Sequence, residues 1–548
     1  MKKKRYLGIF FIVIVPVVFV VHHRNNEAFS FSSIIRDLAY LGKRKVDAVS
    51  NTFSRYYHRL VQKITGIVPL YGVAHVRIGN RLSDDEIEYL QNRKSKVKMA
   101  LEKILEQTFD EEDVPIIALV GSGGGYRAML GITGSLVGMK EIGLLDASTY
   151  ALGLSGSSWG LSAWTASGLP IEEFKERLIE HIEKGIERVS PFELKLMLGA
   201  LATKYISLEP VGLVDLYGLL LANRLLAEFG NKRQHVHFSD FAERIKTGDW
   251  ILPINTAVDG HPDKIYNPAW FEFSPFEIGS SEYEAYVPTW AFGRKFNEGF
   301  SVNFVPEVSL GFLMGTWGSA FAAHAELIWE NLPVPKGTLK RIVENILIKR
   351  IAGRRLTAGR VFNYMKGMPG QFLSNHSYLR LVDGGIGHTN LAYIPVSGER
   401  PRDVDIIIFF DWSGIIDGVL ALKGVQEYAQ SRGLKLPQMD LKGAGQQTIT
   451  VFKDEHDPTV PVIIYIPRFN DQKFWKHNKD NTKLQRYSDL AQFDIEDCVA
   501  KEECNTINFS YKKQAHLVTM LAEANVVINA DKIIETIQWV IEHKKIIN

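Results

Sequence analysis

Five short strand-like runs, with helical patterns between them, predict an α/β protein. Continuous apolar stretches of strand length occupy residues 115–120, 150–154, 406–410 and 462–466, and residues 379–382 are a further plausible strand. The first two runs are each followed by a turn of small residues and then by a helical pattern. Two strand–turn–helix units in succession are typical of a parallel sheet with crossover helices.

Helix signals frame these strands. Ser83 and Glu86 form a capping box, which predicts that a helix begins there and continues to about Leu105. Residues 513–544 are also mostly helical in pattern. Because no internal repeat or Pro/Ser-rich linker divides residues 75–548, we expect them to form one large α/β unit.

A basic stretch interrupts this unit between Pro335 and Gly370. It contains nine Lys or Arg residues and a single acidic residue, Glu344. The stretch predicts either a cap or membrane-facing loop, or a surface helix whose charged face is solvated.

The first residues have the layout of a signal sequence. Four basic residues at positions 2–5 precede an apolar run from Leu7 to Val21, and no small-x-small cleavage site follows the run. A helix of this run is about 22 Å long, which is short for a hydrocarbon core of about 30 Å. We expect residues 1–24 to be an uncleaved signal anchor, with the catalytic domain on the non-cytoplasmic side. Secretion after signal cleavage is the alternative.

Residues 25–74 carry a second basic pattern. Between residues 34 and 64, apolar residues recur at steps of three, four or eight, with Lys and Arg between them. This spacing predicts a basic amphipathic helix near a membrane. Such a helix either lies on an anionic lipid surface or packs on the main unit with its charged face in solvent.

Composition and charge exclude several classes of protein. With 46% hydrophobic and 23% charged residues, the chain is typical of a folded protein rather than a disordered one. The net charge of +2 is too balanced for a surface that binds polyanions, so no nucleic acid partner is expected. Cys498 and Cys504 are too few for a zinc site, so no metal is expected there; they either pair with each other or remain reduced.

Ser155 is the candidate nucleophile. It lies in Gly-Leu-Ser-Gly-Ser at residues 153–157, where a predicted strand turns into a helix. A sharp turn of this kind projects a serine hydroxyl above a sheet, and the start of the next helix stabilises developing negative charge. Small-residue turns are common, so this segment alone is a modest signal.

A glycine-rich turn at residues 121–125 is the candidate oxyanion site. It lacks the third glycine of a dinucleotide fingerprint and the Gly-Lys of a Walker loop. Its consecutive backbone N–H groups at a helix start suit a developing oxyanion. Arg127, two residues further on, has a guanidinium fork suited to a phosphate.

Asp383 is the candidate base. It follows the plausible strand at residues 379–382, and ligands in parallel α/β sheets gather at the carboxyl ends of strands. A carboxylate close to a serine can take its proton directly, and removal from water raises its basicity. The alternative is a Ser-Asp-His triad with His388 or His516 as the third member.

Several of these segments together resemble a known family. Residues 120–129 (Val-Gly-Ser-Gly-Gly-Gly-Tyr-Arg-Ala-Met), followed by the serine of residues 153–157, look like the catalytic domain of cytosolic (group IV) phospholipase A2. That domain is related to fungal lysophospholipases (phospholipase B) and more distantly to patatins. Further segments fit in the same order along the chain: residues 270–279, 291–296, 313–321 and 404–411.

The resemblance implies a patatin-like three-layer fold with a mostly parallel central sheet and a cap or lid insertion. It implies a Ser-Asp dyad, in which Ser155 attacks a lipid ester and Asp383 acts as the base and then activates water. Gly124 and Gly125 would supply oxyanion N–H groups, and Arg127 would hold the phosphate head group. No cofactor or metal is implied.

The expected substrate is a glycerophospholipid or a lysophospholipid at a phospholipid membrane surface. Asp-Gly-Gly at residues 383–385 is closer to the fungal and patatin form than to the animal cytosolic form, so positional preference stays open. Animal members commonly carry a calcium-binding C2 domain, but the residues before Leu82 are too few for one. We therefore expect no C2 domain and no calcium regulation. An acyltransferase using the same dyad and a non-catalytic, membrane-anchored lipid-binding protein are the alternative functions.

Overall fold

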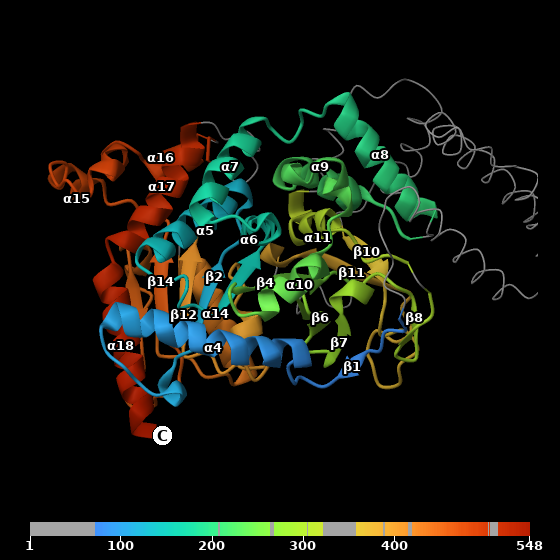
Figure 1. Cartoon of the computed structure of the whole chain (residues 1–548), viewed down its shortest axis with the longest axis horizontal. Coiled ribbons are helices and arrows are strands. Elements are labelled where there is room, and N and C mark those ends of the chain that lie inside the picture. The colour runs from blue at the N-terminus through green and yellow to red at the C-terminus, as the bar shows by residue number, and fades with distance from the viewer. Residues whose placement is uncertain are drawn as a thin grey trace, which may run out of the picture. The chain divides into compact units, whose positions relative to one another are not determined.

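A mixed sheet of twelve strands organises the chain in the computed structural model (Figure 1). The structure describes residues 72–206, 209–262, 268–303, 305–321, 358–386, 389–414, 419–501, 503–504 and 513–547. The predicted anchor, most of residues 25–74, and residues 322–357 of the predicted cap region therefore lie outside the described residues.

The centre of the sheet is parallel. Its strands run in the order β4-β3-β2-β12-β14. Every residue in them is buried, as expected for strands covered on both faces. Their bounds are Ile117–Gly121 for β2, Tyr150–Leu154 for β3, Leu252–Asp259 for β4, Ile406–Asp411 for β12 and Val462–Pro467 for β14.

Antiparallel strands extend this centre at both edges. Past β4 the order continues β5-β6-β7-β1, β13 closes the other edge, and β10 pairs with β11. A separate hairpin joins β8 to β9. The bounds are Arg77–Ile78 for β1, Trp270–Phe273 for β5, Glu277–Ser280 for β6, Ala285–Pro288 for β7, Phe296–Asn297 for β8, Phe300–Ser301 for β9, Gly359–Phe362 for β10, Tyr378–Asp383 for β11 and Thr450–Phe452 for β13.

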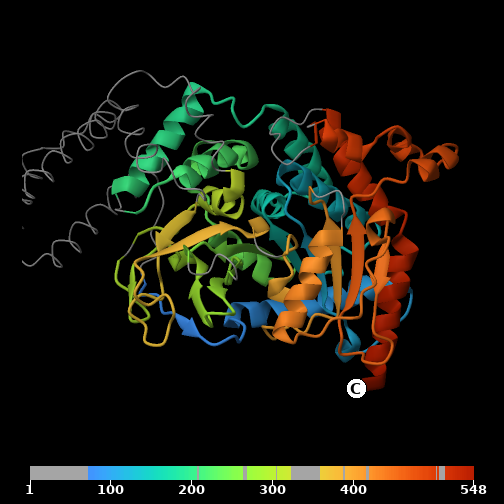
Figure 2. The ribbon, with the colours of Figure 1, turned by 180° about the vertical axis from the view of Figure 1, so that it is seen from behind.

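Helices cover both faces of the sheet. Helix α4 crosses in front of it in Figure 1, and the orange helix α14 lies in front of it when seen from behind in Figure 2. The α-helices of the described residues are α4 (Asp84–Leu105), α5 (Gly125–Glu141), α6 (Gly156–Ser167), α7 (Ile171–Glu183), α8 (Pro191–Ile206), α9 (Leu213–Leu225), α10 (Ala242–Lys246), α11 (Leu310–Trp317), α14 (Val419–Arg432), α15 (Gln472–His477), α16 (Ile495–Ala500), α17 (Lys513–Val527) and α18 (Ala530–Ile547).

The predicted α/β class with a mostly parallel centre is confirmed, and several element bounds agree closely. The Ser83 side chain caps α4 by accepting a hydrogen bond from the Glu86 N–H at 3.2 Å, and α4 ends at Leu105 as predicted. The C-terminal helical pattern is two helices, α17 and α18. Strands β4 to β7 were not predicted, because their short runs contain Pro, Gly and charged residues that weaken a strand pattern.

Two glycines bring α5 close to α17. A Cβ at Gly134 would lie 2.2 Å from the Thr519 carbonyl oxygen, and one at Gly138 would lie 2.7 Å from the Glu523 carbonyl oxygen. Any side chain at these positions would separate the two helices. Helix α5, which begins at the glycine-rich turn, is thereby held firmly on the body of the protein.

A buried charge network lies where β5, β6 and α4 meet the segment after residue 399. Arg402 pairs with Glu86 at 2.7 Å and with Glu272 at 2.9 Å. Arg400 also pairs with Glu272, and with Glu277 at 2.7 Å. Both guanidinium groups are 1% exposed. The network joins segments more than 120 residues apart in the sequence.

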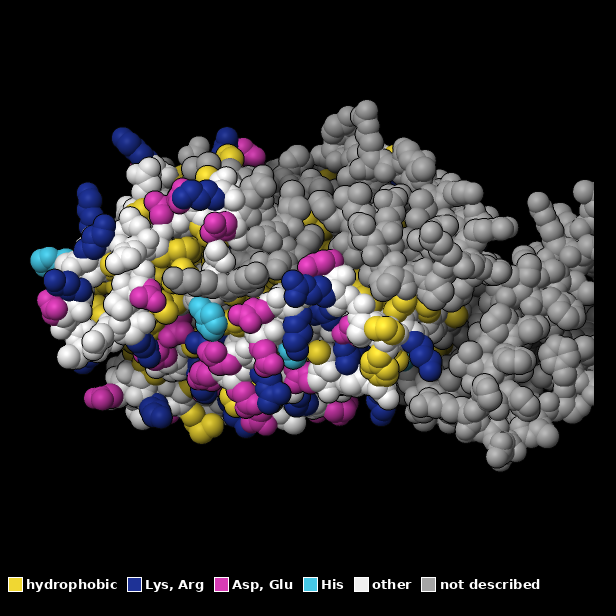
Figure 3. Space-filling view, turned by 90° about the horizontal axis from the view of Figure 1, so that it is seen from above, with side chains coloured by type: hydrophobic (Ala, Val, Ile, Leu, Met, Phe, Trp, Pro, Cys, Tyr) yellow, Lys and Arg dark blue, Asp and Glu magenta, His cyan; other side chains and the backbone are white. Residues whose placement is uncertain are grey.

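The described surface carries mixed charge. Figure 3 shows one face, on which Lys/Arg and Asp/Glu side chains are interspersed over the part that the described residues form. This distribution agrees with the near-neutral composition of the chain.

Candidate active site

Two strands that meet end to end bring Ser155 and Asp383 together. Strand β3 runs parallel to β4 and ends with Leu154 opposite Thr256. Strand β11 runs antiparallel to β4 and ends with Asp383 opposite Ala257. Because β5 occupies the other edge of β4 over the same residues, β3 and β11 share one edge. Their carboxyl ends therefore face each other on adjacent positions of β4.

This arrangement corrects one step of the sequence argument. Asp383 does lie at the carboxyl end of the predicted strand, but that strand is antiparallel to its neighbours β4 and β10. The Asp383 carboxylate reaches the site because β11 points toward β3 along the edge of β4, not because it lies beside β3 in a parallel set.

Ser155 occupies a strained turn between β3 and α6. Its φ of 52° and ψ of −116° are unusual for a residue with a side chain. The next residue must be glycine, since a Cβ at Gly156 would lie 1.9 Å from the Gly125 carbonyl oxygen. The serine turn and the glycine-rich turn are thus in direct contact, and the role of Ser155 as a nucleophile stays a prediction.

The Ser155 hydroxyl donates a hydrogen bond to Asp383 Oδ2 at 2.8 Å. Both side chains are buried, each 2% exposed. Asp383 Oδ1 accepts from the Gly385 N–H at 2.9 Å, and the Ala320 N–H is a further donor to this carboxylate. Burial raises the pKa of Asp383 to about 6, although these hydrogen bonds oppose the shift.

The glycine-rich turn presents backbone N–H groups beside this pair. Gly124, with φ 144°, is the N-cap of α5, and Gly125, with φ 59°, is its first residue. N–H groups at these positions precede the internal hydrogen bonds of the helix, so they are available to a ligand. Side-chain hydrogen bonds hold the turn from two directions: Ser157 Oγ donates to the Ser122 carbonyl at 2.6 Å, and Ser122 Oγ accepts from the Trp412 N–H at 2.7 Å.

Arg127, which was expected to hold a phosphate head group, donates hydrogen bonds to backbone carbonyls of the protein. The side chain is fully buried, with Nε donating to the Trp412 carbonyl at 2.9 Å and Nη1 donating to the Cys504 carbonyl at 2.8 Å. Nη2 lies beside Gly124, 3.2 Å from the position of a Cβ there. The guanidinium therefore braces the glycine-rich turn, and its contact with a phosphate stays a prediction.

The two cysteines form a disulfide. Cys498 and Cys504 are bonded, with Cα atoms 5.2 Å apart. The sequence left open whether they pair. Their loop supplies the Cys504 carbonyl that Arg127 binds.

The histidines of the alternative triad are not placed at the dyad by the described structure. His516 lies on α17 and is exposed. His388 lies outside the described residues. Among the described residues, the hydrogen bonds to the Asp383 carboxylate come from Ser155, Gly385 and Ala320.

Sequence reasoning missed three supporting residues. The Gly123 N–H donates to the Asn390 carbonyl at 3.0 Å, the Trp412 backbone holds Ser122 and Arg127, and Ser319 Oγ accepts from the Asp383 N–H at 2.9 Å. Trp412 and Asn390 each follow a predicted strand or turn by a few residues. This proximity to strand ends is the one sequence signal that could have identified them.

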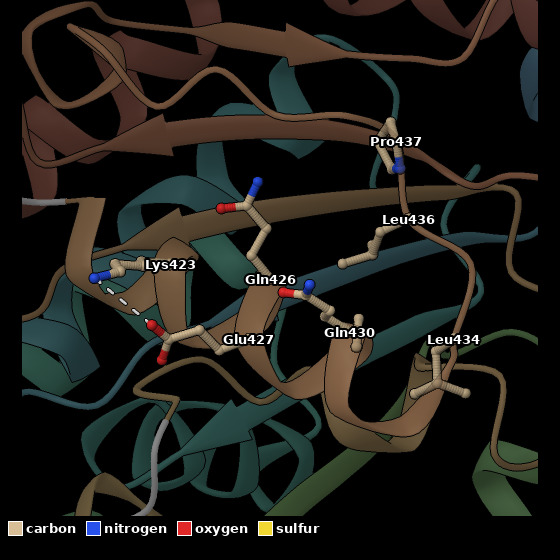
Figure 4. Close-up of a pocket in the computed structure, with 8 residues that line it drawn as sticks. Lys423, Gln426, Glu427, Gln430, Leu434, Leu436 and Pro437 are labelled. Carbon is tan, nitrogen blue, oxygen red and sulfur yellow. Dashed lines mark ion pairs between the residues drawn. The ribbon is translucent and has the colours of Figure 1, made fainter.

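One hollow lies away from this site. A cavity of about 490 Å³ is bounded by α14 and residues 434–437, with Lys423 and Glu427 paired at 3.6 Å on its wall (Figure 4). None of its lining residues belongs to the strands or turns that hold Ser155 and Asp383. It is therefore separate from the candidate active site.

The chain is similar in sequence to known lipid hydrolases. A family model described as the lysophospholipase catalytic domain matches residues 117–428, which is more than half of the chain. Human cytosolic phospholipase A2 zeta is 28% identical over 84% of this chain and 61% of its own length. Human cytosolic phospholipase A2 epsilon is 24% identical over 86% of this chain and 61% of its own length. The chain thus spans less than two thirds of these relatives.

A solved structure shares the fold. Human GIVD cytosolic phospholipase A2 matches with a TM-score of 0.73 at 23% identity, over 85% of this chain and 68% of the other. At this level of identity the likeness concerns the fold alone, and it confirms the predicted patatin-like architecture.

The predicted location is wrong by this comparison. The relatives are named cytosolic phospholipases, which contradicts a signal-anchored protein with its catalytic domain on the non-cytoplasmic side, and equally a secreted one. The apolar run from Leu7 to Val21 was already shorter than the roughly 20 residues that a spanning helix needs.

The helices of the described residues do not include a membrane span. None of their helices combines the length and the apolar composition required to cross a membrane.

Proposed function

Because the chain belongs to the lysophospholipase catalytic domain family, we propose that it is a serine lipid acyl hydrolase. It releases fatty acid from glycerophospholipids, lysophospholipids or both, through an acyl-serine intermediate. The observation that carries this proposal is the 2.8 Å hydrogen bond from Ser155 Oγ to the buried Asp383 carboxylate. The catalytic unit is assigned to residues 75–548, which is supported by the grouping of Leu70–Asn548 in one unit.

In the first half-reaction Asp383 takes the hydroxyl proton while Ser155 Oγ attacks the ester carbonyl carbon. The resulting oxyanion binds the N–H groups of Gly124 and Gly125. The C–O bond to the glycerol then breaks, and Asp383 returns the proton to the departing alkoxide oxygen. A lysophospholipid or glycerophosphodiester leaves, and the acyl group remains on Ser155.

In the second half-reaction water replaces the alcohol. Asp383 takes a proton from the water, the hydroxide attacks the acyl-serine, and the same two N–H groups hold the second oxyanion. Collapse of this intermediate breaks the acyl–Oγ bond, Asp383 returns the proton to Ser155 Oγ, and the fatty acid leaves. An alcohol in place of water would give acyl transfer instead, which product analysis distinguishes.

The electrostatic setting supports these steps. The N-termini of α5 and α6 both lie at the reacting groups, so two helix dipoles favour negative charge there. The buried Arg127 cation adds positive potential beside Gly124. A desolvated carboxylate with a pKa of about 6 is a stronger base than an exposed one.

A long-chain fluorophosphonate tests the proposed nucleophile. We expect one equivalent to bind, peptide mass mapping to locate it on Ser155, and the labelled protein to lose release of fatty acid from phosphatidylcholine and lysophosphatidylcholine vesicles. Release is expected with and without calcium. A label on another residue, or full activity after labelling, would contradict the proposal.

The pH dependence of hydrolysis follows from the pKa of Asp383. The base must be ionised, so kcat/KM is expected to be constant above about pH 7 and to fall below pH 6, by tenfold per pH unit. This fall in kcat/KM toward low pH is the acid limb of the profile. Initial rates of fatty acid release between pH 4.5 and 8.5, corrected for folded protein, measure it. A flat profile down to pH 4.5 would show that no group with this pKa acts as the base.

A further inference from the structure

Asn390 lies between the glycine-rich turn and the turn that follows Asp383. Its carbonyl oxygen accepts the Gly123 N–H at 3.0 Å, and the next residue, Leu391, forms a β-bridge with Ser122. Asn390 is therefore attached directly to the glycine-rich turn. Because this contact occupies the Gly123 N–H, it leaves the following two N–H groups for the oxyanion.

The Asn390 carboxamide occupies the space between this turn and the Asp383 turn. A Cβ at Gly123 would lie 2.4 Å from Asn390 Oδ1. A Cβ at Gly385 would lie 3.3 Å from the same oxygen and 3.2 Å from Asp383 Oδ1. A side chain at Gly123 would displace the carboxamide, and one at Gly385 would crowd both the carboxamide and the Asp383 carboxylate.

The carboxamide has no hydrogen-bond partner of its own among the described residues, and Asn390 is only partly buried. A polar group that borders a buried carboxylate and the glycine-rich turn, and that bonds to no other described side chain or backbone group, is suited to a polar ligand. Its neutrality also matters, since a charge here would act on Asp383 at short range.

We propose that Asn390 is a substrate-positioning residue of the hydrolase, a role that rests on the function proposed above. Its carboxamide hydrogen-bonds to the oxygens of the bound ester, and its backbone holds the glycine-rich turn at the distance from Asp383 that the reaction needs. An uncharged side chain at this position keeps the Asp383 carboxylate ionised near neutral pH.

Two variants separate these contributions. Asn390→Ala removes the carboxamide but adds no charge, so kcat/KM is expected to fall roughly tenfold to a hundredfold with the acid limb unchanged. Asn390→Asp keeps the shape but places a second carboxylate beside Asp383, so the acid limb is expected to move upward by about one pH unit. The matched control is Asn297→Asp, an exposed carboxamide in the β8–β9 hairpin, which is expected to keep the wild-type profile.

The measurements are pH–rate profiles for lysophosphatidylcholine hydrolysis, separate kcat and KM values, and rates of Ser155 labelling by the fluorophosphonate. Thermal unfolding tests whether each variant is folded. If Asn390→Ala does not fold, the nearly isosteric Asn390→Asp variant still tests the inference. Wild-type kcat/KM and an unshifted limb in a folded Asn390→Asp protein would overturn this inference alone. Absence of release by the wild type would overturn the proposed function and this inference with it.

Discussion

Ser155→Ala and Asp383→Asn are each expected to lower fatty acid release by at least about a thousandfold, because each removes one half of the dyad. Alanine leaves no atom to carry the acyl group. Asparagine keeps the shape of Asp383 and an oxygen for the Gly385 N–H, but it cannot take the Ser155 proton. Release from phosphatidylcholine and lysophosphatidylcholine vesicles measures both losses.

Asp383→Asn is also expected to change the stability of the fold. The folded state raises the pKa of Asp383 to about 6 from an ordinary value near 4, so keeping it ionised costs stability above pH 6. The shift corresponds to about 3 kcal/mol at most. Asp383→Asn is therefore expected to raise the urea midpoint at pH 8, and the gain is expected to vanish below about pH 4, where the wild-type carboxyl is neutral in both states.

Asp405→Asn is the matched control for activity. Asp405 is a half-buried carboxylate whose pKa is also raised by desolvation, although its pairing with Lys544 opposes the shift, and it lies before β12 at the opposite end of the sheet. Folded Asp405→Asn protein is expected to retain its rate. If Asp383→Asn kept more than a tenth of wild-type activity, another group would have to be the base.

Arg402→Met is expected to destabilise the fold by about 3–5 kcal/mol, a large part of the stability of an ordinary domain. The guanidinium pairs with Glu86 and Glu272 and also donates to the Pro395 carbonyl at 2.8 Å. Methionine fills similar volume but leaves both carboxylates buried with fewer partners. Urea and thermal unfolding at pH 7 measure the loss.

Acid is expected to weaken the same network. Burial by itself raises the pKa of Glu272, but Arg400 and Arg402 outweigh it and hold the pKa at about 2. Since the folded pKa is below the unfolded value, this stabilisation is complete above about pH 4.5 and is lost as the pH falls toward 2.

The exposed pair Arg81–Asp84, whose side chains are 58% and 90% exposed, supplies the control for Arg402→Met. Arg81→Met is expected to change stability by no more than about 0.5 kcal/mol. A loss below 1 kcal/mol for Arg402→Met would mean that water or rearranged side chains satisfy the two carboxylates.

Local patterns predicted the elements whose signals lie within a short segment. The strand before residue 121, the strand before Ser155 and the capped helix after Ser83 agree with the structure to within a residue or two. Apolar runs and capping residues act over a few positions, so they can be recognised in the sequence without knowledge of the fold. The N-terminal apolar run misled for the same reason, because a local pattern does not state where a protein resides.

Contacts between distant segments followed no such pattern. Three contacts depend on residues that lie far apart in the sequence. These are the antiparallel pairing of β11 with β4, the hydrogen bond between Asn390 and Gly123, and the hydrogen bonds that Arg127 donates to two backbone carbonyls. Backbone carbonyls and N–H groups are the same at every residue, so sequence does not reveal which of them a side chain will meet.

The amino-acid sequence by itself determined the chemical groups: a serine at a strand-to-helix turn, a consecutive set of glycines, and an aspartate at a strand end. The tertiary structure decided that they meet, because β3 and β11 approach each other along one edge of β4 and leave Ser155 Oγ 2.8 Å from Asp383. It also decided the basicity of that carboxylate, since the raised pKa comes from burial, which is a property of the packed molecule and not of any short segment.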